Sequence, residues 1–322
     1  MSSSWQGWVP YRIQARLEGA DCRWLFAGST PFTEPFFEGT IASVQSVPEN
    51  SFGTPRVTPI SALPLAAAEL DTLEPSAFVF HVSRCGSTLV SQLLSLEDSC
   101  VVLSEVPFFD QLLRARFHPE LQGIDAATHL SAAIRLHGQR RSGTERSLVV
   151  KLDSWHTGLH AELRALYPRT PFVLLYREPA AVVRSHQRRP GMHAVRGLIE
   201  DPLFHFGPEA AERPLEDHLP AVLGFYYDTF LEIARTDPRV LLVSYQRDMI
   251  PVVDAIAAFA GIEVSNSARA AWTARAAFHA KQPGERFDEA RVEGPLDPRL
   301  RDCYSRYEAL ENYRCRATSK AR

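Results

Sequence analysis

The sequence contains almost no lysine: of its 35 basic residues only Lys151, Lys281 and Lys320 are lysines, and the rest are arginines. Arginine is therefore the default cation of this chain, and each lysine raises the question whether a compact ammonium group is required at its position. The chain also lacks an excess of positive charge, because its formal net charge is −3. A general nucleic-acid binder needs a basic face, so this balance argues against that class and confines any anion site to a few placed groups.

Long apolar runs are absent as well, and no stretch approaches the roughly 18 apolar residues of a membrane-spanning helix. Residues 1–10 lack the basic start and apolar centre of a signal peptide. The five cysteines are an odd number at irregular spacing, without a CxxC pair. They are typical of free thiols in a reducing compartment rather than of a disulfide frame or a zinc site. We therefore expect a cytoplasmic protein that binds neither nucleic acid nor a membrane and holds no metal.

The N-terminal part differs in pattern from the rest. Two short alternating runs, 11–17 and 22–26, predict a β-hairpin. Thr33 has the character of a helix N-cap, which predicts a helix through about Val44. Residues 48–64 are rich in Pro, Ser and Thr, as a connector would be. We expect an N-terminal extension over residues 1–70 and one larger domain over 71–322.

Short apolar runs and helical patterns alternate from residue 77 onward. The runs predict strands at 77–82, 100–103, 147–150, 172–176 and 240–243. The helical patterns lie near 87–96, 126–137, 158–166, 180–186, 219–234 and 250–260. Buried strands that alternate with helices predict a three-layer α/β fold, with a mainly parallel five-stranded sheet and helices on both faces.

Polar residues follow the predicted strands where each one ends. They are Ser83, Arg84, Cys85, Gly86, Ser87 and Thr88 after the first, then Glu105, Lys151 with Asp153, Arg177, and Tyr245. Ligands of open α/β sheets bind beyond the carboxyl ends of the strands. The pattern therefore predicts one site at this edge of the sheet.

The first strand, its polar turn and the helix starting near Ser87 form a candidate phosphate loop. Gly86 would let a ligand approach the backbone, and the N–H groups and dipole of the helix start favour an anion. Compared with the nucleotide-triphosphatase motif GxxxxGK[ST], His81 replaces the first glycine and Ser87 replaces the lysine. The missing lysine argues against ATP or GTP hydrolysis. The plain alternative is a helix capped by Ser and Thr after a strand.

A second anion signal lies in residues 176–185, with the sequence YREPAAVVRS. Arg177 follows a strand, Pro179 starts a helix, and Ser185 lies about two helical turns further on. An arginine suits a phosphate dianion because its paired donors match the oxygens. The alternative is a strand-end arginine that pairs with a surface carboxylate.

Together, these two segments resemble the superfamily of sulfotransferases that use 3′-phosphoadenosine 5′-phosphosulfate (PAPS). The resemblance covers roughly residues 76–264. It implies that residues 83–88 bind the 5′-phosphosulfate and that Arg177 and Ser185 bind the 3′-phosphate. Tyr245 resembles the tyrosine of a later family segment, YEDL. This chain has Gln246 where that segment has its glutamate.

The resemblance also implies roles in sulfuryl transfer to a hydroxyl or amine of a small-molecule or glycan acceptor, with 3′,5′-adenosine diphosphate (PAP) as product. Glu105 is the favoured base and Asp153 its rival, while Lys151 and Arg84 would stabilise developing negative charge. Lys281 lies in a loop that could close over the cofactor, and residues 187–220 have the composition of a substrate lid. Two alternatives stay open: a small-molecule kinase, and a nucleotide-binding module without turnover.

Overall fold

The computed structural model describes residues 4–52, 54–278 and 297–320. In that part of the chain every helix is too short or too polar to span a bilayer.

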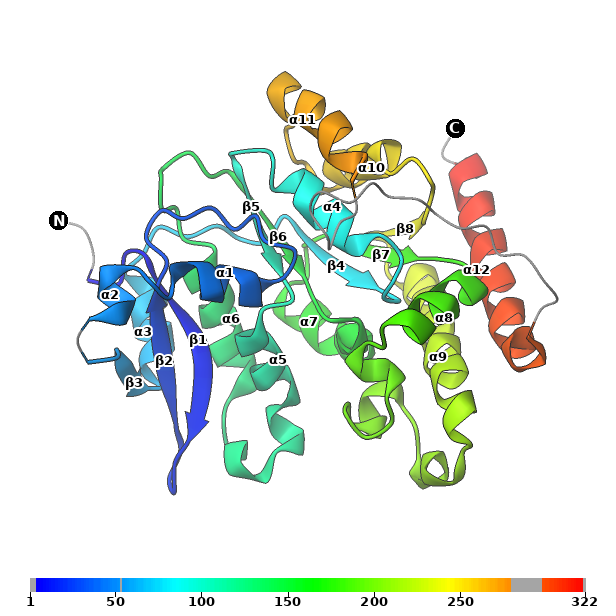
Figure 1. Cartoon of the computed structure of the whole chain (residues 1–322), viewed down its shortest axis with the longest axis horizontal. Helices are drawn as coiled ribbons and strands as arrows, with labels where there is room; N and C mark the ends of the chain where they lie inside the picture. Colours follow the sequence, from blue (N-terminus) through cyan, green and yellow to red (C-terminus); the bar gives the residue numbers. More distant parts are fainter. Residues whose placement is uncertain (1–3, 53, 279–296, 321–322) are drawn as a thin grey trace. The chain divides into compact units, whose positions relative to one another are not determined.

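Five strands form the main sheet in the order β5-β6-β4-β7-β8 (Figure 1). They are β4 (Ala77–His81), β5 (Cys100–Ser104), β6 (Ser147–Lys151), β7 (Phe172–Tyr176) and β8 (Val240–Ser244). The pairs β5–β6, β4–β7 and β7–β8 are parallel. All side chains of β4, β5, β6 and β7 are buried, as expected for a parallel sheet flanked by helices. The predicted α/β fold class is confirmed, and each strand lies within one residue of its predicted bounds.

Helices follow the strands as the alternating pattern predicts. They are α4 (Ser87–Leu94), α5 (Pro107–Arg114), α6 (Ala126–His137), α7 (His160–Leu166), α8 (Pro179–Arg188), α9 (Leu215–Thr236), α10 (Ile250–Ala260), α11 (Asn266–Ala276) and α12 (Arg301–Lys320). The predicted helices correspond to α4 and α6–α10, whereas α5, α11 and α12 were not predicted. Within residues 187–220, the predicted lid, the chain forms the short 3₁₀ helices η4 (Met192–Ala194), η5 (Asp201–Phe204) and η6 (Pro208–Glu212) before α9 begins.

The chain forms two compact units. The first comprises Met1–Ala77, Ser91–Lys151 and Gly261–Arg275, and the second comprises Phe78–Val90, Leu152–Ala260 and Ala276–Arg322. The prediction of a boundary near residue 70 stays a prediction.

The first unit begins with a small antiparallel sheet. Its strands β1 (Trp8–Ala15), β2 (Ala20–Phe26) and β3 (Val57–Pro59) lie in the order β1-β2-β3. The predicted hairpin is thus confirmed. The predicted connector, residues 48–64, contains β3 and the helix α2 (Pro48–Ser51), and α3 (Ala62–Ala68) begins before it ends. Pairing with β2 supplies the long-range backbone bonds that the composition does not reveal.

Helix α1 (Phe37–Val44) corrects another prediction. Thr33 is not its N-cap: the residue before the helix is Phe36, with an extended backbone (φ −140, ψ 150) and no side-chain cap bond. Pro35 disfavours a helical conformation for Glu34, the residue that would start a helix capped by Thr33, and the extended backbone of Phe36 places the start at Phe37.

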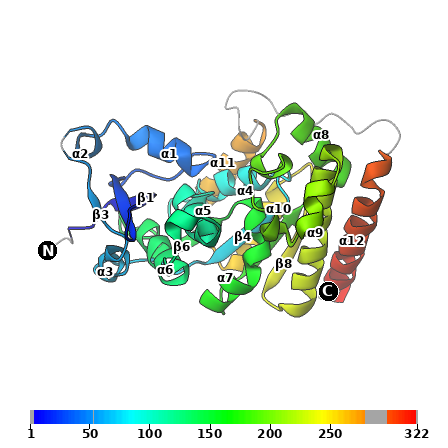
Figure 2. The same cartoon turned by 90° about the horizontal axis from the view of Figure 1, so that it is seen from below.

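The second unit is completed by the C-terminal helix. In both views α12 runs alongside α9 (Figures 1 and 2). The hydroxyl of Tyr313 donates to the carbonyl oxygen of Ala234 at 2.8 Å, and Arg306 pairs with Asp228. Tyr304 donates to the carboxylate of Glu178, directly after Arg177. Helix α12 therefore supports the segment that follows β7.

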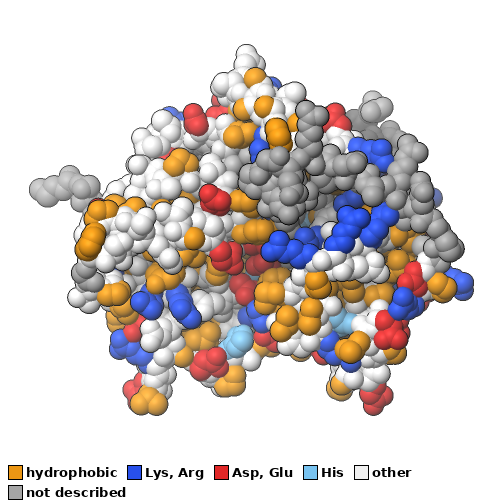
Figure 3. All heavy atoms as spheres, viewed as in Figure 1, with side chains coloured by type: hydrophobic (Ala, Val, Ile, Leu, Met, Phe, Trp, Pro, Cys, Tyr) orange, Lys and Arg blue, Asp and Glu red, His pale blue; other side chains and the backbone are white. Residues whose placement is uncertain are grey.

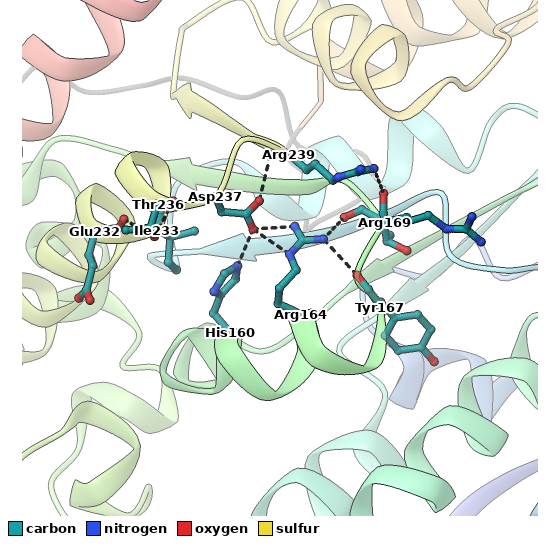
Figure 4. Close-up of polar contacts among 10 residues, drawn as sticks. His160, Arg164, Tyr167, Arg169, Glu232, Ile233, Thr236, Asp237 and Arg239 are labelled. Carbon is teal, nitrogen blue, oxygen red and sulfur yellow. Dashed lines mark hydrogen bonds and ion pairs between the residues drawn. The ribbon is translucent and has the colours of Figure 1, made fainter.

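A buried carboxylate holds the amino ends of β7 and β8 (Figure 4). Asp237 accepts hydrogen bonds from His160 Nε2 at 3.1 Å and from Arg164 Nε at 2.8 Å. The backbone N–H of Arg239 donates to its other oxygen at 2.9 Å. Arg164 also donates to the carbonyl oxygens of Tyr167 and Thr170. Since this network lies at the edge opposite the strand ends that carry the predicted site, we assign it to stability.

Candidate functional site

The candidate phosphate loop, residues 83–88, has an unusual backbone. Ser83 (φ 64), Arg84 (φ 50) and Gly86 (φ 83) all lie in the left-handed region. For residues with a side chain this conformation costs about 1–2 kcal/mol each. Other contacts must therefore hold Ser83 and Arg84 in place.

Three hydrogen bonds hold the loop in place within the second unit. The N–H of Ser83 donates to Nδ1 of His81 at 3.0 Å. The thiol of Cys85 donates to the carbonyl oxygen of Leu175 in β7 at 3.3 Å. The carbonyl oxygen of Arg84 accepts a bond from Nη1 of Arg177 at 3.1 Å. The loop is thus fixed by its own strand, by the neighbouring strand and by the predicted second anchor.

Gly86 is required for two reasons. Its φ of +83 suits glycine, and a Cβ added there would lie 3.0 Å from Cδ2 of Tyr245 and 3.1 Å from Cε of Met249. Helix α4 begins directly after this close approach, with Ser87 and Thr88 buried. The N–H groups of the first helical turn lack partners inside a helix and favour an anion.

Arg177 meets the phosphate loop and Tyr245 at one place. Its guanidinium carbon lies 4.2 Å from the centre of the Tyr245 ring, the same ring that packs on Gly86. The buried Tyr227 donates its hydroxyl to the carbonyl oxygen of Arg177 at 2.8 Å, which fixes the backbone of this residue. Burial raises the pKa of Tyr227 well above its ordinary value, so this hydroxyl keeps its proton. Three strand ends predicted to share a site thus come together in the second unit.

Helix α8 continues from this point with a basic face. Ser185 lies on it, half-buried, two turns after its start. Arg184 and Arg188 belong to the same helix, and Nη2 of Arg84 donates to the carbonyl oxygen of Arg189 at 2.5 Å. Figure 3 shows basic side chains gathered over the part of the surface where α8 lies. The surroundings of Arg177 and Ser185 are therefore suited to an anion.

Glu105 and Lys151 form an ion pair in the first unit. Lys151 is the last residue of β6 and its side chain is fully buried. Glu105 follows β5 with a left-handed φ of 51, and its N–H donates to the carbonyl oxygen of Lys151 at 2.8 Å. Backbone and side chains of these two residues are therefore held together, as expected for a pair positioned at strand ends.

The N-terminal segment adds two residues that the sequence did not reveal as neighbours of this pair. The ring centre of Phe36 lies 5.5 Å from Nζ of Lys151. Partial burial and the nearby charges of Glu105 and Asp110 raise the pKa of Glu38, while Lys151 opposes the shift. No motif marks Glu38 or Phe36, because their position depends on how the N-terminal segment folds back.

Two predicted site residues remain, Asp153 and Lys281. Asp153, in the second unit, is buried, with Oδ2 4.0 Å from Nδ1 of His156. Lys281 lies outside the described residues.

Comparisons with known proteins give similarity in structure only. No family model and no curated protein matches the sequence. A sulfotransferase from Alicyclobacillus acidocaldarius aligns with 16% identity and a TM-score of 0.43, over 75% of this chain and 96% of that one. Sulfotransferase STF9 from Mycobacterium avium aligns with 14% identity and a TM-score of 0.47, over 79% of this chain and 80% of that one. Mouse sulfotransferase SULT7A1, solved in complex with PAP, aligns with 12% identity and a TM-score of 0.35, over 74% of this chain and 72% of that one. These values describe a likeness in structure to sulfotransferases at low sequence identity.

Proposed function

We propose that this protein transfers a sulfuryl group from PAPS to a hydroxyl or amine of a small-molecule or glycan acceptor. One observation carries the proposal: the guanidinium of Arg177 bonds to the carbonyl oxygen of Arg84 and lies over the ring that packs on Gly86. The two proposed phosphate anchors thus lie together in one unit. A ligand with phosphates at both ends of one ribose has the chemistry that such a pair of anchors would recognise.

In this proposal the loop takes the 5′-phosphosulfate. The N–H groups at the start of α4 and the hydroxyls of Ser87 and Thr88 supply donors for it. Arg177 and Ser185 take the 3′-phosphate, which as a dianion favours charge-assisted bonds from a guanidinium. Ser87 in place of a lysine disfavours a triphosphate, because the loop lysine of ATP- and GTP-binding proteins reaches the β- and γ-phosphates.

The proposed reaction forms one bond and breaks one. The acceptor oxygen or nitrogen attacks the sulfur, and the bond between the sulfur and the bridging oxygen of the 5′-phosphate breaks. The electron pair stays on PAP, and the acceptor proton passes to a carboxylate. We assign the proton to Glu105, with Asp153 as rival, and the stabilisation of the leaving phosphate to Arg84 and Lys151. The ion pair between Glu105 and Lys151 places the proposed base beside one of the groups proposed to stabilise negative charge.

Calorimetry with PAP and with ATP·Mg²⁺ tests the donor assignment. We expect PAP to bind in the micromolar range without added metal and more tightly than ATP·Mg²⁺. Tighter binding of ATP·Mg²⁺ would favour the small-molecule kinase instead. Incubation of the protein with PAPS and a metabolite extract, followed by a search for masses increased by one sulfuryl group, tests transfer and identifies the acceptor.

A further inference from the structure

His81 occupies a position that the proposed chemistry does not use. His81 is the last residue of strand β4 and is only 4% exposed. Each of its two ring nitrogens makes a hydrogen bond. Nδ1 lies 3.0 Å from the backbone nitrogen of Ser83, and Nε2 lies 3.0 Å from the carbonyl oxygen of Leu152. The ring therefore connects the phosphate loop with the segment that follows β6.

The two partners determine which ring nitrogen carries the proton. A backbone N–H can only donate, so Nδ1 of His81 must accept from Ser83. A carbonyl oxygen can only accept, so Nε2 must donate to Leu152. Both bonds exist together only in the neutral imidazole with its proton on Nε2. A protonated ring would present an N–H to the N–H of Ser83.

The bond to Ser83 acts on the strained part of the loop. Ser83 and Arg84 are consecutive residues with left-handed backbones, at φ 64 and φ 50. A non-glycine residue keeps such a conformation only where its surroundings determine it. Nδ1 of His81 accepts a hydrogen bond from the N–H of Ser83, and Arg177 donates a hydrogen bond to the carbonyl oxygen of Arg84.

We infer that His81 is a positioning residue of the phosphate loop, which as the neutral Nε2–H tautomer holds Ser83 in the left-handed conformation and so preforms the site of the 5′-phosphate. The statement about the ligand rests on the proposed function, whereas the tautomer and the loop geometry do not. The inference assigns His81 no contact with the reacting groups.

Two substitutions of similar size test the inference. Asn in His81→Asn offers Oδ1 as an acceptor near the place of Nδ1, whereas His81→Leu offers none. Both variants lose the ring and its bond to Leu152, so a purely structural effect of that loss is common to the two. Loss of one hydrogen bond, about 1.4 kcal/mol, corresponds to roughly tenfold in affinity. We expect His81→Leu to weaken PAP binding about tenfold and His81→Asn to weaken it clearly less.

Adenosine 3′-monophosphate serves as the control ligand, because it lacks the 5′-phosphate that the loop would bind. We expect its affinity to stay the same in both variants. Equal losses for the two ligands, or equal losses of PAP affinity in the Asn and Leu variants, would overturn the inference. Failure of the wild-type protein to bind PAP would instead contradict the proposed function.

A measurement on the unaltered protein decides the tautomer independently of any nucleotide and of the folding of the variants. Nitrogen-15 spectra of the histidine rings separate a protonated from an unprotonated ring nitrogen. We expect the His81 ring, identified by its contacts, to carry its proton on Nε2 alone at neutral pH. A proton on Nδ1 would contradict the proposed hold on Ser83.

Discussion

The guanidinium of Arg177 donates a hydrogen bond to the carbonyl oxygen of Arg84 at 3.1 Å, across a separation of 93 residues in the chain. Because the two predicted anion-binding segments are joined in this way, Arg177→Ala should remove one anchor and loosen the other. Charge-assisted bonds contribute about 1.5–3 kcal/mol each, so we expect PAP affinity measured by calorimetry to fall roughly ten- to hundredfold.

Arg239→Ala is the matched control for this variant. Arg239 directly precedes β8, at the amino edge of the sheet, and its side chain donates a hydrogen bond to the carbonyl oxygen of Arg169 at 3.2 Å. Loss of the same charge there should leave PAP affinity nearly unchanged. A comparable loss in both variants would mean that net charge, and not a defined anchor, determines binding.

Gly86→Ala should disturb the phosphate loop both by a steric clash and by strain of the backbone. Gly86 and Gly143 share the same φ of +83, but a Cβ at Gly143 meets nothing within 4 Å, while one at Gly86 meets Tyr245 and Met249. Both substitutions place a side chain on a left-handed backbone, which destabilises the fold by about 1–2 kcal/mol. We expect Gly86→Ala to lower PAP affinity more than tenfold, by a shift of the Tyr245 ring.

Gly143→Ala should lower the thermal midpoint slightly and leave PAP affinity intact. Titrations of the two variants, beside thermal unfolding of each, separate the loop effect from the general cost. Unchanged PAP affinity in Gly86→Ala would show that the nucleotide does not lie against this turn.

The assignment of the base predicts a loss of turnover without a loss of binding. Glu105→Gln keeps a hydrogen-bond acceptor beside Lys151 but cannot take a proton, so turnover should fall by roughly 10²–10⁴ while PAP affinity changes little. PAP formation with the acceptor found in the metabolite screen measures the rate. Asp153→Asn is the comparison, and the role moves to Asp153 if that variant alone loses turnover.

Asp237 gives a prediction about stability. Its side chain is 8% exposed and binds His160, Arg164 and the N–H of Arg239. Asp237→Asn loses the charge and leaves an amide that cannot accept all three bonds, so we expect a loss of roughly 1–3 kcal/mol in the free energy of unfolding. Urea denaturation followed by tryptophan fluorescence measures it, and PAP affinity should be retained because the network lies at the other edge of the sheet.

The same network predicts how stability depends on pH. Partial burial acts to raise the pKa of Asp237, but the bonds from Arg239 and Arg164 and the charge of Arg164 lower it below its ordinary value. Burial lowers the pKa of His160, and Asp237 opposes this shift. Both folded-state values lie below those of the unfolded chain, so each group stabilises the fold at neutral pH and loses its contribution as pH falls. His160 should lose it first, below its ordinary pKa near 6.5, and Asp237 at lower pH. In Asp237→Asn the part of the decline below the ordinary Asp pKa near 3.8, where Asp237 itself takes a proton, should be shallower. An unchanged decline in that range would show that Asp237 does not cause it.

The sequence was sufficient for the sheet because its strands are buried on both faces and are therefore continuous apolar runs, such as 172–176. Strand ends then located Arg177 and Tyr245 at one edge. The start of α1 was misplaced because Thr33 has the character of a cap, whereas the backbone of Phe36 is extended and the helix begins at Phe37.

The structural partners of the site residues could not be predicted in this way. His81 acquires its role from a carbonyl group 71 residues away, and Glu38 from the folding of the N-terminal segment beside Glu105 and Lys151. Neither contact has a local pattern, since both depend on which backbone or side-chain groups the folded chain brings together.

A crystal structure of the protein with PAP would show directly whether the two anchors bind one nucleotide. We expect one nucleotide in the second unit, with its 5′-phosphate on the N–H groups that follow Gly86 and its 3′-phosphate on Arg177 and Ser185. A nucleotide bound elsewhere, or one whose 3′-phosphate makes no contact with Arg177, would contradict it.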